Sequence, residues 1–148
     1  MKSYPLVESV FFHKSVANDE AAAHLKIAVG APTFHIRNKL SLLNEVVSID
    51  DITIDPTRFA KLSPAQFKER PNTIYNLYQD AFGITVVRTD ERLRAEAASI
   101  DHAKLLKVAA GTPVLTIRRT AFDMRDEPVE LRISTVNTAA HEYFAEIL

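Results

Sequence analysis

The sequence contains an internal repeat with an offset of 81 residues, and this repeat constrains the fold more than any other feature. Nine of the 21 residue pairs between positions 17–37 and 98–118 are identical. Gly30 and Gly111 form one such pair, and Pro32 and Pro113 form another. Because glycine and proline mark turns, the matching pairs predict that both copies have the same turns. The chain is therefore expected to contain one structural unit twice.

Each copy has the pattern of a β-α-β-β unit. An alternating run precedes a short helix, which begins after Asn18 or Ser99 and is expected to end at the paired glycine. Two further runs, joined by a tight polar turn, complete the unit. The expected strands are 6–14, 33–42 and 46–54 in the first copy and 85–95, 114–122 and 129–137 in the second. Strands joined by so short a turn are antiparallel, so the two copies predict an α+β fold with a six-stranded antiparallel sheet and helices on one side.

The segment between the copies, residues 55–83, has a different pattern. Its first part is expected to be an irregular, partly buried crossover. Its second part predicts a helix that begins after Asn72 or Thr73 and ends at Gly83. Tyr75 and Tyr78 lie one helical turn apart, a spacing more typical of core aromatic residues than of a pocket lining.

Composition narrows the class of protein. A chain of 148 residues with 47% hydrophobic and 25% charged residues fits one folded domain over 1–148. Its net charge of -1 argues against DNA binding by this domain alone. No cysteine is present and the five histidines lack metal-ligand spacing, so we expect no metal site and no cofactor. No apolar stretch is long enough to cross a membrane and no signal peptide opens the chain, which favours the cytoplasm.

Three motifs follow one another along the second half of the chain. They are Thr73-Ile74-Tyr75-x-Leu77 with Phe82-Gly83-Ile84, the stretch 97–123 with Gly111-Thr112-Pro113, and Glu127-Pro128-Val129-Glu130. Together they resemble the UTRA (UbiC transcription regulator-associated) domain. Their order and the duplication carry the resemblance over nearly the whole chain. It implies a chorismate lyase-like fold and the effector-binding half of a HutC-type regulator of the GntR family.

The resemblance also implies partners. In such regulators an N-terminal winged helix-turn-helix domain binds operator DNA, while this domain binds a small metabolite and forms a homodimer. No winged helix is found in residues 1–148, so the chain is expected to be either a fragment that begins after the linker or a stand-alone sensor. DNA contact is expected only through the absent domain.

Two other functions remain open. A lyase on the same scaffold would use one glutamate as an acid and one arginine as an anion clamp. The family's enzymes lack the Gly-Thr-Pro and Glu-Pro-Val-Glu motifs, so we expect no catalytic residues. A dimerisation module without a ligand would require side chains to fill the pocket.

Candidate pocket residues are polar side chains that share a strand face with core residues. Asn38 falls on the apolar face of 33–42, and Arg119 has the equivalent position in the second copy. A buried arginine needs an anion, from the protein or from a ligand. Strand alternation and the family resemblance together predict a ligand site between the sheet and the segment around Tyr75. The expected contacts come from the strands and from the helix after Thr73: Asn38, Leu40, Ser48, Asp50, Tyr75, Arg119, Glu130, Arg132 and Ser134.

The same residues have plainer interpretations. Arg119 and Glu130 are equally well explained as a cross-strand ion pair, and Asp50 as a solvated strand residue. Many family members carry Arg-x-Arg where this sequence has Asn38-Lys39-Leu40, so one part of an anion site is missing. We therefore expect a ligand with hydrogen-bonding groups and some apolar surface that is not a doubly charged sugar phosphate.

Overall fold

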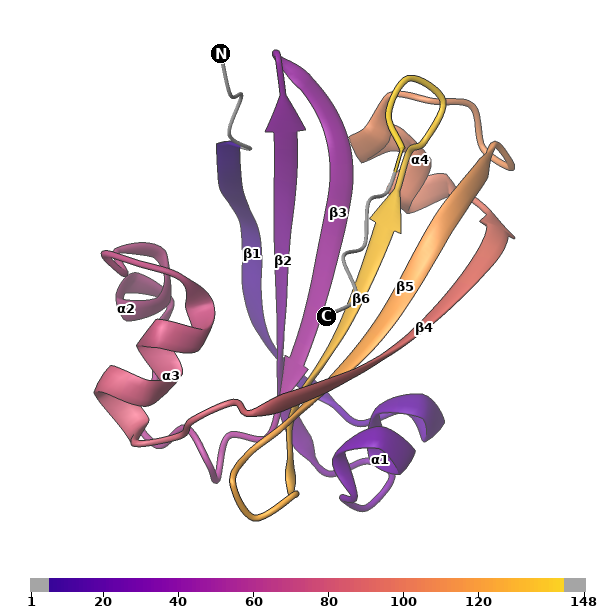
Figure 1. Cartoon of the computed structure of the whole chain (residues 1–148). Helices are drawn as coiled ribbons and strands as arrows, with labels where there is room; N and C mark the ends of the chain where they lie inside the picture. Colours follow the sequence, from indigo (N-terminus) through magenta and orange to yellow (C-terminus); the bar gives the residue numbers. More distant parts are fainter. Residues whose placement is uncertain (1–5, 143–148) are drawn as a thin grey trace.

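The computed structural model describes residues 6–142 of the chain. Within this range, all strands join one antiparallel sheet in the order β1-β2-β3-β6-β5-β4 (Figure 1). The elements are β1 (Leu6–Val16), α1 (Asp19–Leu25), β2 (Pro32–Leu42), β3 (Glu45–Ile54), α2 (Pro64–Lys68), α3 (Ile74–Phe82), β4 (Arg88–Ala97), α4 (Ile100–Leu106), β5 (Pro113–Phe122) and β6 (Pro128–Val136). The predicted α+β fold with two β-α-β-β copies is confirmed.

The two copies are related by a pseudo-twofold axis between β3 and β6, the central pair of the sheet. Their turns correspond closely. The Gly30 amide donates to the Ala17 carbonyl at 2.8 Å, and the Gly111 amide donates to the Ala98 carbonyl at 2.9 Å. Both glycines have a positive φ, 82° and 84°, which explains why glycine occurs at both positions. The prediction of equivalent turns is confirmed.

The two short helices begin as predicted but do not end at these glycines. Asn18 and Ser99 are the N-caps, and each side chain accepts a backbone hydrogen bond from the third residue after it. The helices end instead at Lys26 and Lys107, whose φ values of 56° and 58° are left-handed. The expectation that glycine ends these helices is wrong, because the glycines form the turn that follows.

Helices cover both faces of the sheet, which corrects the expectation that they lie on one side. α2 and α3 cover Ile36, Ile52 and Ile54, whereas α1 packs on Leu131 of β6 and α4 packs on Ile49 of β3. Figure 1 shows α1 and α4 towards opposite ends of the sheet. β3 has buried isoleucines on both faces, Ile52 and Ile54 on one and Ile49 on the other, so each face requires a covering layer.

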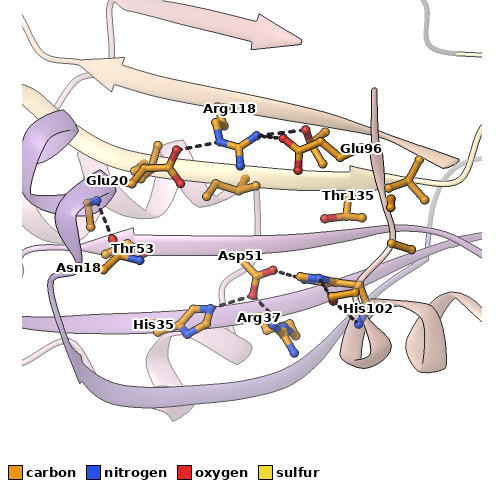
Figure 2. Close-up of a pocket in the computed structure, with 18 of the residues that line it drawn as sticks. Asn18, Glu20, His35, Arg37, Asp51, Thr53, Glu96, His102, Arg118 and Thr135 are labelled. Atoms are coloured by element: carbon orange, nitrogen blue, oxygen red, sulfur yellow. Dashed lines mark hydrogen bonds and ion pairs between the residues drawn. The ribbon is translucent and has the colours of Figure 1, made fainter. Parts of the chain in front are cut away.

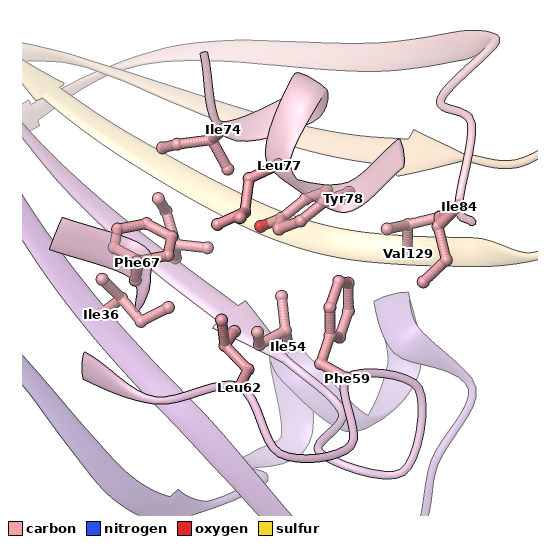
Figure 3. Close-up of a cluster of buried hydrophobic side chains, with 11 residues drawn as sticks. Ile36, Ile54, Phe59, Leu62, Phe67, Ile74, Leu77, Tyr78, Ile84 and Val129 are labelled. Carbon is pink, nitrogen blue, oxygen red and sulfur yellow. The ribbon is translucent and has the colours of Figure 1, made fainter. Parts of the chain in front are cut away.

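The segment between the copies supplies six of the eleven buried residues of the largest hydrophobic cluster in the described part of the chain. It contains α2, which was not predicted, and α3, which begins after Thr73 and ends at Gly83 as predicted. Phe59, Phe67 and Tyr78 are fully or almost fully buried against β2 and β3 (Figure 3). Burying each aromatic side chain contributes roughly 1.5–3 kcal/mol, so this segment anchors α3 over the sheet. No helix within residues 6–142 is long and apolar enough to span a membrane.

Candidate functional site

Two clusters of polar side chains lie on opposite faces of the sheet. We call the first the inter-copy junction; it is centred on Asp51 and lies on the face covered by α1 and α4. We call the second the α3-side cluster; it contains Asp50, Tyr75, Glu130, Arg132 and Ser134. The alternation of β3 accounts for this division, because adjacent residues of a strand point to opposite faces.

The inter-copy junction surrounds a cavity of about 410 Å³. Asp51 accepts hydrogen bonds from Arg37 Nε at 2.7 Å, His35 Nε2 at 2.7 Å and His102 Nε2 at 2.8 Å (Figure 2). An ionised carboxylate is only an acceptor, so both imidazoles carry a hydrogen on Nε2. Three elements, β2, β3 and α4, are thus joined at one carboxylate.

The pKa of Asp51 reflects these contacts. Burial alone would raise it, but the hydrogen bonds from His102, His35 and Arg37 outweigh burial and hold the pKa well below its ordinary value. Asp51 is therefore ionised at neutral pH. Its charge is compensated by Arg37, whose own side chain is largely buried.

The junction also contains two ion pairs, each of which joins a strand of one copy to the helix of the other copy. Arg37 of β2 binds Asp101 at the start of α4 with 2.7 Å between Nη1 and Oδ2. Arg118 of β5 binds Glu20 at the start of α1 with 2.8 Å between Nε and Oε2. The two arginines correspond in the repeat, as do the two acidic residues. Each copy therefore holds the helix of the other copy.

The junction needs no further partner to satisfy its polar groups. Arg118 also binds Glu96 at 2.9 Å, and no buried side-chain nitrogen or oxygen of the junction residues within 6–142 is without a hydrogen-bond partner. The arrangement is that of a structural connection between the copies. The sequence reasoning overlooked it, although the identity of Arg37 and Arg118 in the repeat was the signal that could have found it.

The α3-side cluster is built around Glu130, which is fully buried. Its carboxylate accepts a hydrogen bond from the Tyr78 hydroxyl and lies 2.8 Å from Arg132 Nε. Burial would lower the pKa of Arg132, but the charge of Glu130 outweighs burial and raises it. The Arg132 guanidinium also lies 5.2 Å from the centre of the Tyr75 ring, within range of a cation–π interaction.

The first-copy residues of the predicted site lie beside this pair. Asp50 is buried and accepts hydrogen bonds from Ser134 at 2.7 Å and Ser48 at 3.3 Å. Its interpretation as a solvated strand residue is therefore wrong. Asn38 is buried opposite Asp50 on β2, and Leu40 lies opposite Ser48. The structure thus brings together seven of the predicted residues on β2, β3 and β6, namely Asn38, Leu40, Ser48, Asp50, Glu130, Arg132 and Ser134.

Arg119 occupies a different place from the one that an ion pair with Glu130 requires. It binds Glu91 of β4, with 2.8 Å between Nη2 and Oε1. In the register of the sheet Arg119 lies opposite Arg132, and Ala121 lies opposite Glu130. The interpretation as an Arg119–Glu130 ion pair is wrong for this reason. The pseudo-twofold axis relates the cross-strand neighbours Arg119 and Arg132 to the cross-strand neighbours Asn38 and Asp50.

Three buried polar atoms on this side lack a well-formed hydrogen bond within the described residues. They are Tyr75 Oη, Arg132 Nη2 and Arg70 Nε. Arg132 Nη2 lies 2.7 Å from Glu130 and Arg119 approaches the Tyr75 hydroxyl, but neither contact forms a well-directed hydrogen bond. Buried polar groups in folded proteins normally form good hydrogen bonds, so this concentration of atoms that lack them indicates that a further partner can be accommodated here.

The sequence reasoning missed the basic residues beside this cluster. A cavity of about 470 Å³ is lined by residues from β1, β2, the end of α2 and the connection between α2 and α3, namely Val7, Glu8, Ser9, Asn38, Lys68, Arg70 and Asn72. Lys68 ends α2, a helix that was not predicted although Ser63 and Pro64 are typical of a helix start. Within residues 6–142, no group of three or more His, Cys, Asp or Glu residues is arranged to hold a metal ion.

Comparison with known proteins identifies relatives of the whole fold. The family model for the UTRA domain matches residues 7–142. The ligand-binding domain of a protein assigned to the GntR family of transcriptional regulators, from Bordetella bronchiseptica, is 30% identical with a TM-score of 0.90, covering 98% of this chain and 90% of that one. The effector domain of PhnF from Mycobacterium smegmatis shares the fold at 21% identity and a TM-score of 0.82, covering 99% of this chain and 88% of that one.

A curated relative is described at the level of a whole protein. The probable fructoselysine utilization operon transcriptional repressor of Escherichia coli K12 is 27% identical over 124 residues. The match covers 84% of this chain and 50% of that protein. The chain therefore spans about half the length of the curated relatives it matches.

Proposed function

Because the chain belongs to the UTRA domain family, we propose that it is the small-molecule-sensing domain of a HutC-type transcriptional regulator. It is homologous to effector domains of GntR-family regulators. A lyase built on the same scaffold is not favoured, since the relatives are regulators and no finding points to catalysis. The fold alone would not separate the two functions.

The observation that supports ligand binding most directly is the set of buried polar atoms in and beside the α3-side cluster that lack a well-formed hydrogen bond. Leaving a buried donor or acceptor without a partner costs about 1–3 kcal/mol. A metabolite that supplies the partners would recover this free energy on binding. We propose that its contacts come from the residues expected from the sequence: Asn38, Leu40, Ser48, Asp50, Tyr75, Arg119, Glu130, Arg132 and Ser134.

The proposed regulator works as a homodimer in the cytoplasm. DNA binding would come from a winged helix-turn-helix domain outside this chain, and paired domains match the two half-sites of an operator. The curated relative is named as a repressor, which favours repression that the metabolite relieves. Light scattering tests the oligomeric state: the expected mass is twice 16.6 kDa, and a monomer at micromolar concentration contradicts the proposal.

A thermal-shift screen of metabolites tests the sensing function. A ligand at 100 times its dissociation constant should raise the free energy of unfolding by about 2.7 kcal/mol. The matched variant is Tyr75→Phe, which removes only the unpaired hydroxyl. It should weaken the ligand about tenfold and leave the ligand-free domain as stable as the wild type.

The control is Tyr78→Phe, which removes a hydroxyl that already has Glu130 as its partner. This change should destabilise the ligand-free domain. If no metabolite stabilises the wild type, the sensing function is refuted. If Tyr75→Phe responds to a ligand as the wild type does, the proposed site is refuted.

A further inference from the structure

We propose that the ligand of the α3-side cluster carries a single carboxylate, and that Arg70 and Arg132 bind this group beside Asn38. The proposal rests on the proposed sensing function and adds the chemical class of the ligand. It also assigns a binding role to Arg70, which lies outside the set of contacts expected from the sequence.

Arg70 is held in position by the end of α2. Its guanidinium lies over the Phe67 ring, 4.7 Å from the ring centre, and its Nη1 donates to the Phe67 carbonyl at 2.7 Å. Phe67 is itself almost fully buried. Within residues 6–142 the side chain is thus oriented without an acidic partner, and its buried Nε lacks a hydrogen-bond partner.

Arg70 and Arg132 come close enough to affect each other. Burial lowers the pKa of Arg70, and the charge of Arg132 lowers it further. Each of the two guanidinium groups has a buried nitrogen that lacks a well-formed hydrogen bond, which an anion could supply. A carboxylate placed between them would accept from both and relieve their repulsion.

The charges around the cavity favour one negative charge on the ligand. On the cavity wall Lys68 and Arg70 oppose Glu8, which also lies 3.9 Å from Lys39. Arg132 does not line this cavity and is paired with Glu130. When Lys39 and the nearby Asp50 are counted with these groups, one positive charge is left over. The nearby Asp50 disfavours a second negative charge, because its only described hydrogen bonds come from two neutral serines. A monoanionic carboxylate therefore fits better than a doubly charged phosphate.

NMR of the arginine side chains tests the proposal with sodium acetate as the probe, at ionic strength held constant with sodium chloride. Acetate should shift the Arg70 and Arg132 signals along one saturable curve. Arg70→Gln should weaken acetate binding, followed at Arg132, about tenfold. Arg70→Lys keeps the charge without the planar fork and should recover only part of the affinity. Arg92→Gln, an exposed arginine of β4, is the control and should bind acetate as the wild type does.

Three results would overturn the proposal: a response that does not saturate, an unchanged affinity in Arg70→Gln, and inorganic phosphate binding the same arginines more tightly than acetate at pH 8. The experiments distinguish a failure of the carboxylate proposal from a failure of the sensing function. If acetate binds as expected but no metabolite stabilises the domain, the anion site stands and the sensing function fails. If a neutral metabolite stabilises Arg70→Gln as well as the wild type, the sensing function stands and the carboxylate proposal fails.

Discussion

Asp51 shows how strongly a single residue can connect this fold. Its carboxylate joins β2, β3 and α4 through three hydrogen bonds, and its side chain is only 12% exposed. A buried charge with several donors stabilises a fold only while every partner is present. The contribution of Asp51 is therefore best measured by removing its charge and keeping its shape.

We predict that Asp51→Asn lowers the free energy of unfolding by about 3 kcal/mol, because Arg37 loses its buried partner. Asp90→Asn is the matched control: Asp90 also binds an arginine, Arg88, but both side chains are largely exposed. That variant should lose less than about 1 kcal/mol. Urea denaturation of the three proteins measures the difference, and equal losses would contradict the buried role of Asp51.

The pH dependence of stability should carry the signature of the same carboxylate. The pKa of Asp51 in the folded state lies well below the ordinary value of 3.8. A depressed folded-state pKa adds stability above the unfolded-state value, and this stability is lost as the pH falls towards the folded-state value. The free energy of unfolding should therefore decrease below about pH 4.

Urea denaturation between pH 3 and pH 7 checks this prediction. The pKa values of Asp101 and Asp123 are also lowered, so Asp51→Asn should retain part of the decrease. A variant whose stability falls as steeply as that of the wild type would show that Asp51 is not a main source.

For single residues, the sequence predicts which face of the sheet a side chain lies on better than it predicts which residue that side chain binds. Strand alternation correctly places Asn38, Asp50 and Arg119 on the face of the apolar core. It does not assign Arg119 to Glu91 or Glu130 to Arg132, because a partner depends on the register between strands and on strands distant in sequence. Arg70 escaped notice for a similar reason: its position follows from the packing of Phe67, not from a local pattern.

Among the elements, the two short helices are the clearest test of local rules. Their N-caps are predictable because Asn and Ser are strong N-cap residues. Their ends are not predictable, since lysine is not expected in a left-handed conformation. The same exception occurs at Lys26 and Lys107, so the repeat preserves it.

We predict that Lys26→Gly and Lys107→Gly each raise the free energy of unfolding by up to about 1 kcal/mol, because glycine adopts a positive φ without strain. Lys104→Gly, within α4, is the control and should lower the free energy by about 1 kcal/mol. Thermal and urea unfolding measure all three. Opposite signs for the two cap variants would contradict the equivalence of the copies.

For the whole molecule, the main feature is that each copy covers the other. The Ala17, Ala21, Ala22 and Leu25 cluster of the first copy packs on Leu131 of the second, and α4 packs in turn on Ile49 of the first. The duplication is visible in the sequence, but this mutual packing is not. A helix that packs on its own copy and a helix that packs on the other copy would have the same local sequence pattern.

We predict that the first copy alone, residues 6–54, does not unfold cooperatively as a monomer. Without the second copy, α1 lacks Leu131 of β6 to pack on and β3 lacks β6 as its neighbour in the sheet. Circular dichroism during urea unfolding tests this, with the whole chain as the reference. A sigmoidal transition at concentrations where the fragment is monomeric would contradict the mutual dependence of the copies.

The two faces of the sheet differ in how closely the residues at equivalent positions of the two copies resemble each other. In the inter-copy junction, Arg37 and Arg118 occupy equivalent positions of the repeat. Across the α3-side cluster, Asn38 and Asp50 correspond to Arg119 and Arg132, so an amide and an acid stand where the other half has two bases. A symmetric cavity would accept a guest equally well in either of two opposite orientations. A cavity whose two halves carry different side chains accepts only one, and so distinguishes the head of an asymmetric molecule from its tail.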